Sequence, residues 1–232
     1  MNPRVSVAAF IAVMVSSSLM VAAVPDSLFP TLADQHTAQR RRVFQPVDLG
    51  LLEAPDRDEW QKPDQIMDTL RIAEGSTVAD LGAGSGWFTM HLARRVGPNG
   101  IVYGEDIQAP MVDYISVRAR RENLPWVRPI LGTATDPRLP AGVDVILIVD
   151  TYHEVDDPVT FLRNAARSLK PQGVIGVVDF LPGGGGPGPA PEDRPDPRAV
   201  IEAAEKAGLQ LDTREDFPPF VFLLVFERAN PE

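Results

Sequence analysis

Residues 78–89 combine an acidic side chain with closely spaced glycines, a pattern typical of a turn that binds a ligand. The segment reads Val-Ala-Asp-Leu-Gly-Ala-Gly-Ser-Gly-Trp-Phe-Thr, so an apolar run ends at Asp80 and is followed by Gly82, Gly84 and Gly86. Glycine adopts positive φ and lets a ligand approach the backbone closely, because it has no Cβ. Free amides at the start of a helix favour electron-rich ligand atoms. Asp80 can accept hydrogen bonds from a ligand's ammonium or hydroxyl groups.

The spacing of these glycines differs from that of a dinucleotide-binding turn, which is G-x-G-x-x-G. Counted from Gly82, the third glycine would fall on Trp87, and counted from Gly84 it would fall on Thr89. The pattern D-x-G-x-G-x-G instead resembles the first motif of the class I S-adenosylmethionine-dependent methyltransferases. The resemblance covers about residues 56–228 and is greatest to small bacterial members with an N-terminal export-type segment. It implies S-adenosylmethionine as the cofactor and leaves the methyl acceptor unidentified.

Apolar runs alternate with amphipathic segments along the chain and would position this turn. Strands are expected at 77–80, 101–105, 127–131, 143–149, 174–178, 209–214 and 221–227, and helices at 63–70, 87–96, 109–122, 158–169 and 198–207. Continuous β-branched runs separated by crossover helices are typical of parallel strands buried on both faces. The sequence therefore predicts an α/β fold, a doubly wound, seven-stranded, mostly parallel Rossmann-like sheet that ends in a C-terminal antiparallel strand pair.

Ligands of such sheets lie beyond the carboxyl ends of the strands. Asp106 follows the second strand and can bind both ribose hydroxyls, with Glu105 as the alternative. The resemblance implies a larger set of cofactor-binding residues after the first four strands: Asp80, Gly82, Ala83, Gly84, Gly86, Asp106, Ile107, Thr133, Ala134 and Asp150. Thr133 departs from the family pattern, which often has an acidic residue there to contact the adenine amino group. Asp136 or backbone groups are the alternatives for that contact.

The segment Asp150-Thr-Tyr-His-Glu after the fourth strand carries the candidate catalytic residues, and the resemblance places it near the reactive methyl group. Methyl transfer requires alignment of donor and acceptor, and a hydroxyl or ammonium acceptor must also lose a proton to a base. His153 or Glu154 can be that base, and Tyr152 can orient the acceptor. The alternative is structural: Tyr152 packs, His153 caps the turn and Glu154 is solvated.

The chain is expected to divide into a signal peptide or membrane anchor at 1–23, an N-terminal arm or lid at 24–62 and a methyltransferase domain at 63–232. Residues 5–24 carry no charge, follow Arg4 and end in small residues, so they can act as a cleaved signal or as a membrane tether. We expect an exported (periplasmic) or membrane-anchored protein rather than a cytoplasmic one. Which side of a membrane the domain occupies stays open. Within the arm, Trp60 and Gln61 are candidates for a lid over the cofactor.

The amino-acid composition of the chain limits the classes of substrate and cofactor that it is expected to bind. A formal net charge of −10 disfavours nucleic acid as the substrate. The expected acceptor is a small molecule, with an exposed protein group as the alternative. The chain has no cysteine and three histidines, so no metal site is expected. The oligomeric state is not indicated. Two other functions remain open: a nicotinamide-dependent oxidoreductase, disfavoured by Trp87, and a non-catalytic binding module that retains the fold.

Overall fold

The computed structural model describes residues 50, 53–183, 185–217 and 220–229. The expected signal peptide or anchor at 1–23 and most of the arm at 24–62 lie outside these described residues. Chain contacts separate residues 1–39 from a unit spanning 40–232, and the description below concerns that second unit. Across the described ranges, no helix is both long enough and apolar enough to span a bilayer.

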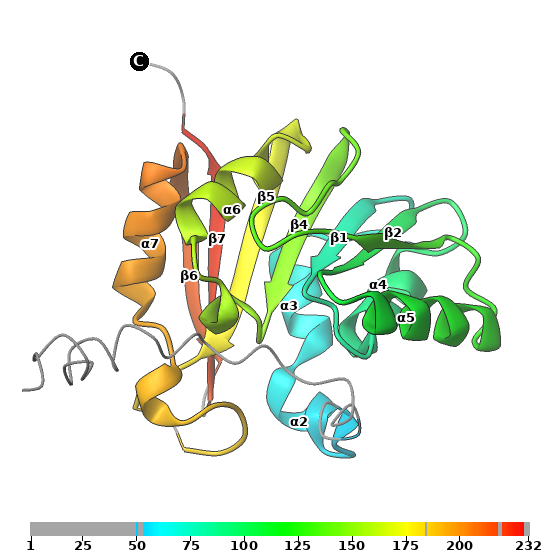
Figure 1. Cartoon of the computed structure of the whole chain (residues 1–232), viewed down its shortest axis with the longest axis horizontal. Helices are drawn as coiled ribbons and strands as arrows, with labels where there is room; N and C mark the ends of the chain where they lie inside the picture. The colour runs from blue at the N-terminus through cyan, green and yellow to red at the C-terminus, as the bar shows by residue number, and fades with distance from the viewer. Residues whose placement is uncertain (1–49, 51–52, 184, 218–219, 230–232) are drawn as a thin grey trace, which may run out of the picture. The chain divides into compact units, whose positions relative to one another are not determined.

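The unit is built on a seven-stranded sheet with the strand order β3-β2-β1-β4-β5-β7-β6 (Figure 1). The strands are β1 (Thr77–Leu81), β2 (Ile101–Asp106), β3 (Val127–Leu131), β4 (Val143–Val149), β5 (Leu169–Phe180), β6 (Leu209–Phe217) and β7 (Val221–Arg228). β1 to β5 are parallel, whereas β7 runs antiparallel to both β5 and β6. The predicted doubly wound sheet with a terminal antiparallel pair is confirmed. Strand order reverses between β1 and β4, where such sheets bind ligands.

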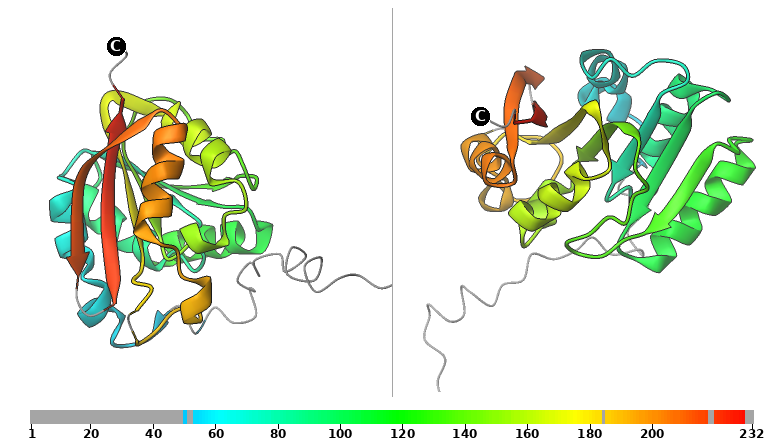
Figure 2. Two further views of the ribbon diagram at one scale, coloured as in Figure 1. Left: turned by 90° about the vertical axis from the view of Figure 1, so that its left-hand side faces the viewer. Right: turned by 90° about the horizontal axis from the view of Figure 1, so that it is seen from above.

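Two layers of helices cover the sheet. The helices are α2 (Arg57–Gln61), α3 (Pro63–Thr69), α4 (Trp87–Val96), α5 (Ala109–Arg121), α6 (Pro158–Ala166) and α7 (Pro197–Lys206). Side chains of α3, α4 and α5 join one apolar cluster with the sheet, and those of α6 and α7 join a second cluster on the opposite face. Figure 2 shows α7 lying against β6 and β7.

The side chains of β7 alternate between these two apolar clusters. Val221, Leu223 and Val225 belong to the cluster under α3 and α4, and Phe222, Leu224 and Phe226 belong to the cluster under α6 and α7. Successive side chains of a strand point to opposite faces, so an unbroken apolar run indicates burial on both sides.

The predicted boundary between the helix at 158–169 and the next strand is wrong by several residues. α6 ends at Ala166, and β5 already begins at Leu169, which pairs with Val143. The amide of Val143 donates to the carbonyl of Ser168, so pairing with β4 replaces the last helical turn. Two short 3₁₀ helices, η3 (Tyr152–Glu154) and η4 (Pro191–Asp193), were not expected, because three residues carry no periodic signal.

Candidate active site

The glycine turn between β1 and α4 has the backbone that its sequence requires. Gly82, Gly84 and Gly86 have φ values of +67°, +53° and +72°, which other residues rarely adopt. A Cβ on Gly82 would lie 2.2 Å from Cγ2 of Thr151, whose hydroxyl donates to the Gly82 carbonyl at 3.1 Å. The turn is thereby tied to the segment that follows β4, so its glycines serve close packing as well as positive φ.

Two carboxyl groups at the end of β2 accept hydrogen bonds from the backbone amides of this turn. The Gly84 amide donates to Oδ2 of Asp106 at 3.0 Å, and the Gln108 amide donates to Oδ1 at 2.9 Å. The Gly82 amide donates to Oε2 of Glu105 at 3.4 Å. A carboxylate has about four acceptor positions, so Asp106 retains acceptor capacity for a ribose diol after these two bonds.

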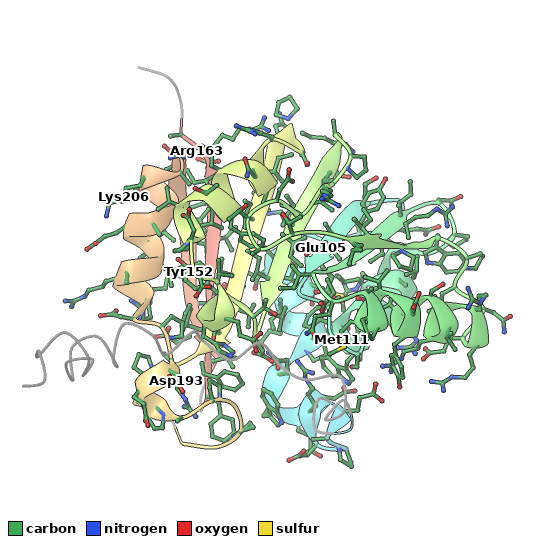
Figure 3. The ribbon with its side chains drawn as sticks, in the orientation of Figure 1. Glu105, Met111, Tyr152, Arg163, Asp193 and Lys206 are labelled. Carbon is green, nitrogen blue, oxygen red and sulfur yellow. The ribbon has the colours of Figure 1, made fainter. Side chains whose placement is uncertain are left out.

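Glu105, which is labelled in Figure 3, is more deeply buried than Asp106, with 1% of its surface exposed. Among the described residues, its Oε1 has no hydrogen-bond partner, and a Cβ on Gly132 would lie 1.8 Å from that oxygen. Burial, followed by the nearby charge of Asp106, raises the pKa of Glu105 to about 8. This side chain is therefore a neutral acid at pH 7, and Asp106 is the better candidate for the ribose contact.

Asp80, the acid that precedes the glycines, is also buried. Its Oδ2 accepts a hydrogen bond of 2.6 Å from the Thr89 hydroxyl in α4. Burial raises the pKa of Asp80 to about 6, partly offset by this bond and by the positive charge of Arg57. In this structure its carboxyl group fastens the turn to α4, while its charge contributes to an acidic strand edge.

The edge formed by β2 and β3 combines apolar side chains with a tight turn. Ile107 and Leu131 are 41% and 43% exposed, unusual for large apolar residues at strand ends. An exposed apolar pair suits a flat base, although Leu131 was not predicted. The Thr133 hydroxyl is used within its own turn, where it accepts from the Asp136 amide at 3.0 Å and donates to the Asp136 carbonyl. Ala134 and Asp136 are exposed.

Asp150 follows β4 and is held by the arm. Its Oδ2 forms an ion pair of 2.8 Å with Nη2 of Arg57, and its Oδ1 accepts from Nε2 of Gln61 at 3.3 Å. Its φ of +51° is unusual for aspartate. Burial raises the pKa of Asp150 to about 6, against the opposing effect of Arg57. The expected lid residue Gln61 thus reaches the site, and Arg57, which sequence reasoning missed, reaches it too.

Trp60 turns from the same short helix toward an aromatic group. Its ring lies 5.9 Å from that of Phe180 and 6.4 Å from that of Phe220, measured between centroids. Phe180 ends β5, so this group stands beside the carboxyl ends of β4 and β5. Figure 1 shows α2 and the segment after β5 at the same end of the sheet.

His153 pairs with an acid that sequence reasoning missed. Its Nδ1 lies 3.1 Å from Oδ1 of Asp179, and its amide donates to Oδ2 at 3.1 Å. Asp179 is fully buried in β5. Burial lowers the pKa of His153, but the bond to Asp179 and the charges of Asp179, Glu154 and Asp150 outweigh it, so the pKa is raised. Because the carboxylate accepts from Nδ1–H, Nε2 of the neutral ring carries the lone pair.

The other two predicted catalytic residues differ in their surroundings. Tyr152 is 4% exposed and belongs to the apolar cluster under α6 and α7, which agrees with the structural alternative. The Oε1 atom of Glu154 lies 3.9 Å from Nε2 of His153. The structure therefore brings His153 and Glu154 together and places the Tyr152 ring in the core.

The proline- and glycine-rich segment after β5 is organised by Arg194, another residue that the sequence did not single out. Its guanidinium donates to the carbonyls of Leu181, Gly185, Pro187 and Pro189 at 3.1–3.4 Å. It also lies 5.4 Å from the centre of the Phe180 ring. The segment is thus an ordered strap, defined as residues 181–196, with the exception of residue 184, which is not described.

The hydrogen-bond acceptors of this edge fit S-adenosylmethionine. A ribose diol, an ammonium group and a sulfonium all present hydrogen-bond donors or positive charge, and Asp106 and Asp150 offer carboxylate oxygens. Thr151 packs so closely on Gly82 that this position of the turn has no room for a side chain. Within the described ranges, no group of three or more histidine or acidic side chains is arranged to hold a metal ion.

Comparison with known proteins agrees with the fold. Residues 78–173 match a family model described as a methyltransferase domain. Nocamycin O-methyltransferase of Saccharothrix syringae is 34% identical over 119 residues, which are 51% of this chain and 42% of that protein. A demethylmenaquinone methyltransferase of Lactobacillus johnsonii is 29% identical over 132 residues, which are 56% of this chain and 53% of that protein. The chain thus spans about half the length of these curated relatives.

A solved structure extends the similarity over most of the domain. The crystal structure of a SAM-dependent methyltransferase from Aquifex aeolicus superposes with a TM-score of 0.75 at 28% identity, covering 79% of this chain and 98% of that one. Together with the glycine turn and the strand order, these similarities support a class I S-adenosylmethionine-dependent methyltransferase fold, with residues 78–173 matching the methyltransferase domain itself.

Proposed function

We propose that this protein binds S-adenosylmethionine at the carboxyl ends of β1, β2 and β4 and transfers its methyl group to a small-molecule acceptor. The observation that carries the proposal is the glycine turn, whose amides meet the acids at the end of β2 where strand order reverses. Asp106 would hold the ribose hydroxyls, and Ile107 with Leu131 would flank the base. The bound cofactor supplies an electrophilic methyl carbon on a positively charged sulfur.

The charge at this edge supports a cationic ligand. Asp80, Asp106, Asp150 and Asp179 lie at or just after the carboxyl ends of β1, β2, β4 and β5, and Arg57 offsets part of the charge of Asp80 and Asp150. A buried acidic environment stabilises a nearby positive charge strongly, because the local dielectric constant is low. A sulfonium donor therefore suits the site better than an anionic dinucleotide does.

His153 is the residue best placed to take a proton from the acceptor. Asp179 orients its ring through Nδ1 and stabilises the imidazolium that forms, leaving Nε2 as the base. Glu154, next to Nε2, would favour the protonated ring. This arrangement suits an acceptor whose hydroxyl or ammonium group must lose a proton before or during methylation.

Trp60, Phe180 and Phe220 support a small acceptor with apolar surface. They form an aromatic group beside Asp179, with the strap packed on it: a Cβ on Gly188 would lie 2.6 Å from the Phe180 ring. Nocamycin O-methyltransferase and demethylmenaquinone methyltransferase, by their names, act on small molecules. The net charge of −10 argues in the same direction, against nucleic acid.

The proposed location is the periplasm or the surface of a membrane, directed by residues 1–23. Its support is the uncharged run at 5–24 after Arg4. Fractionation of cells that express the full chain tests it: recovery only in the cytosol, at full length, would contradict it.

Thermal unfolding with S-adenosylhomocysteine tests cofactor binding. A ligand that binds only the folded state at 100 times its Kd stabilises that state by about 2.7 kcal/mol, so the Tm rises measurably. No change in Tm at saturating ligand would refute the proposal. NADH is the control ligand, and a Tm rise with NADH alone would favour the oxidoreductase alternative.

Turnover separates an enzyme from a binding module. We expect label from methyl-labelled S-adenosylmethionine to enter a small molecule when the protein is incubated with a bacterial extract, and His153→Gln to lose this transfer while still binding S-adenosylhomocysteine. Binding without transfer from any extract would favour the non-catalytic alternative.

A further inference from the structure

The edge of the sheet formed by α5 and β3 has a hollow that the proposed methyl transfer does not use. Its volume is about 610 Å³, and it lies between the last turns of α5 and the start of β3. The candidate active site lies instead at the carboxyl ends of the strands. α5 and β3 stand at the side of the domain opposite α7 and β6 (Figure 1). The hollow therefore belongs to a separate surface.

The lining of the hollow combines apolar side chains with a charged rim. Leu124, Trp126 and Pro129 contribute apolar surface, and Arg120 contributes the charge. Nε1–H of Trp126 donates to the carbonyl of Ala93 at 2.7 Å, so the polar atom of this ring is already bonded within the domain. A ligand that matches this lining has an apolar body and an anionic head.

The C-terminal end of α5 carries excess positive charge, although the whole chain is acidic. Glu122 is the acid at this helix end, and the arginines that approach it are Arg94, Arg118 and Arg121. Glu53 adds a second acid, which pairs with Arg118. Arg120 donates to Oγ of Ser116 at 2.7 Å and, within the described part of the chain, forms no ion pair. Helix C-termini favour cations, which accounts for the arginines but not for the apolar hollow beside them.

Two features around the hollow favour a lipid over an added peptide strand. Val117, three residues before Arg120 on α5, is 55% exposed, the highest value among the large apolar side chains of the described ranges. β3 is an edge strand that pairs with β2, but its central residue, Pro129, has no N–H to donate to a further strand. Exposed apolar side chains beside arginine and tryptophan are typical of surfaces at a membrane interface.

We propose that the surface formed by α5 and the start of β3 binds an anionic phospholipid of a membrane, with the phosphate on Arg120 and an acyl chain in the hollow against Trp126. The inference goes beyond the proposed methyl transfer and does not depend on it. The uncharged run at 5–24 favours a membrane as the source of the ligand, because it is long enough to act as a tether. The net charge of −10 makes an anionic membrane repel most of the chain, so contact is restricted to this basic edge.

Quenching of tryptophan fluorescence by lipids brominated on the acyl chain tests the inference on the full chain. The tryptophans are Trp60, Trp87 and Trp126, so the uncharged run has none and quenching reports contact with the domain itself. Vesicles of equal parts phosphatidylglycerol and phosphatidylcholine should quench the wild type, and phosphatidylcholine alone should quench it much less. Trp126→Phe should lose this quenching and still sediment with the anionic vesicles.

Two arginine variants test the proposed phosphate contact. Arg120→Gln should raise the lipid concentration for half-maximal quenching about 5-fold, the factor that corresponds to about 1 kcal/mol for one arginine at an anionic surface. Arg167→Gln is the matched control, because Arg167 is exposed at the end of α6 on the opposite face of the sheet, and it should leave the titration unchanged. The Tm of each variant shows whether the fold is retained.

Arg4 and Arg40 to Arg42 also attract anionic vesicles, so sedimentation alone does not support the inference. A wild type that sediments with the vesicles while its fluorescence stays unquenched would bind through the N-terminal segment only, and this result overturns the inference. Quenching that persists in Trp126→Phe overturns it as well, and so does an equal effect of Arg120→Gln and Arg167→Gln in folded variants. Should Trp126→Phe fail to fold, the comparison of the two arginine variants still decides.

Discussion

Replacing Glu105 with glutamine is expected to remove a decline of stability with pH. The pKa of this side chain is about 8 in the folded protein and 4.5 without perturbation. Between these values the folded state keeps a proton that the unfolded state has released, so the free energy of unfolding falls as pH rises, by about 1.4 kcal/mol per pH unit. The decline ends above the folded pKa.

The size of the effect follows from the same shift. From pH 6 to pH 9, Glu105 should lower the free energy of unfolding by about 3 kcal/mol, and the glutamine variant should lack this contribution. Other buried acids, such as Asp80 and Asp150, titrate in both proteins and largely cancel from the difference. The stability of the variant relative to wild type should therefore increase by about 3 kcal/mol between the two pH values.

Urea denaturation followed by tryptophan fluorescence measures this difference, because Trp60 and Trp87 are packed in the domain. Glu202→Gln, an exposed substitution on α7, is the control and should show the same pH dependence as wild type. If Glu105→Gln keeps a constant offset from wild type at pH 6 and pH 9, the carboxyl group is already ionised in the folded protein. The account of the buried edge would then be wrong.

Three further substitutions test other parts of the site. Gly82→Ala should destabilise the fold by more than about 1 kcal/mol and abolish the Tm rise with S-adenosylhomocysteine, because its Cβ meets Thr151 and its φ is positive; a wild-type response would contradict this. Arg194→Ala should make the strap cleavable by limited proteolysis while far-ultraviolet circular dichroism is retained; unchanged resistance would show that the strap is ordered without it. Asp179→Asn should shift the lower limb of the pH–rate profile to lower pH and reduce the maximal rate, since Asp179 helps raise the pKa of His153; an unmoved limb would remove His153 as the base.

The sheet could be predicted because each of its strands has a recognisable pattern within its own segment of the sequence. Each parallel strand is buried on both faces and therefore appears as an apolar run, and the helices between strands have their own period. The glycine turn could be predicted for the same reason, since positive φ at Gly82, Gly84 and Gly86 is imposed within the turn. The boundary near Leu169 could not, because pairing with Val143 decides it.

The missing site residues depend on contacts between distant parts of the chain. Arg57 meets Asp150 and His153 meets Asp179 only after the sheet has formed, and neither arginine nor aspartate shows in its local sequence that it will be buried. Gln61 was expected to belong to a lid from the arm that precedes the domain. In the structure the arm returns to the edge of the sheet, where Gln61 contacts Asp150. The burial of Glu105 beside Gly132 likewise arises from the pairing of β2 with β3.

The helix that grips the end of β4 is also the first helix of the described domain. Whatever precedes Arg57 in the chain is covalently joined to a five-residue helix whose Arg57 and Gln61 side chains contact Asp150 after β4. If this edge binds S-adenosylmethionine as proposed, truncation at that junction is expected to alter ligand affinity, because it would disturb the contact between Arg57 and Asp150. The proposed N-terminal anchor and the proposed ligand site would then be joined through this one short helix.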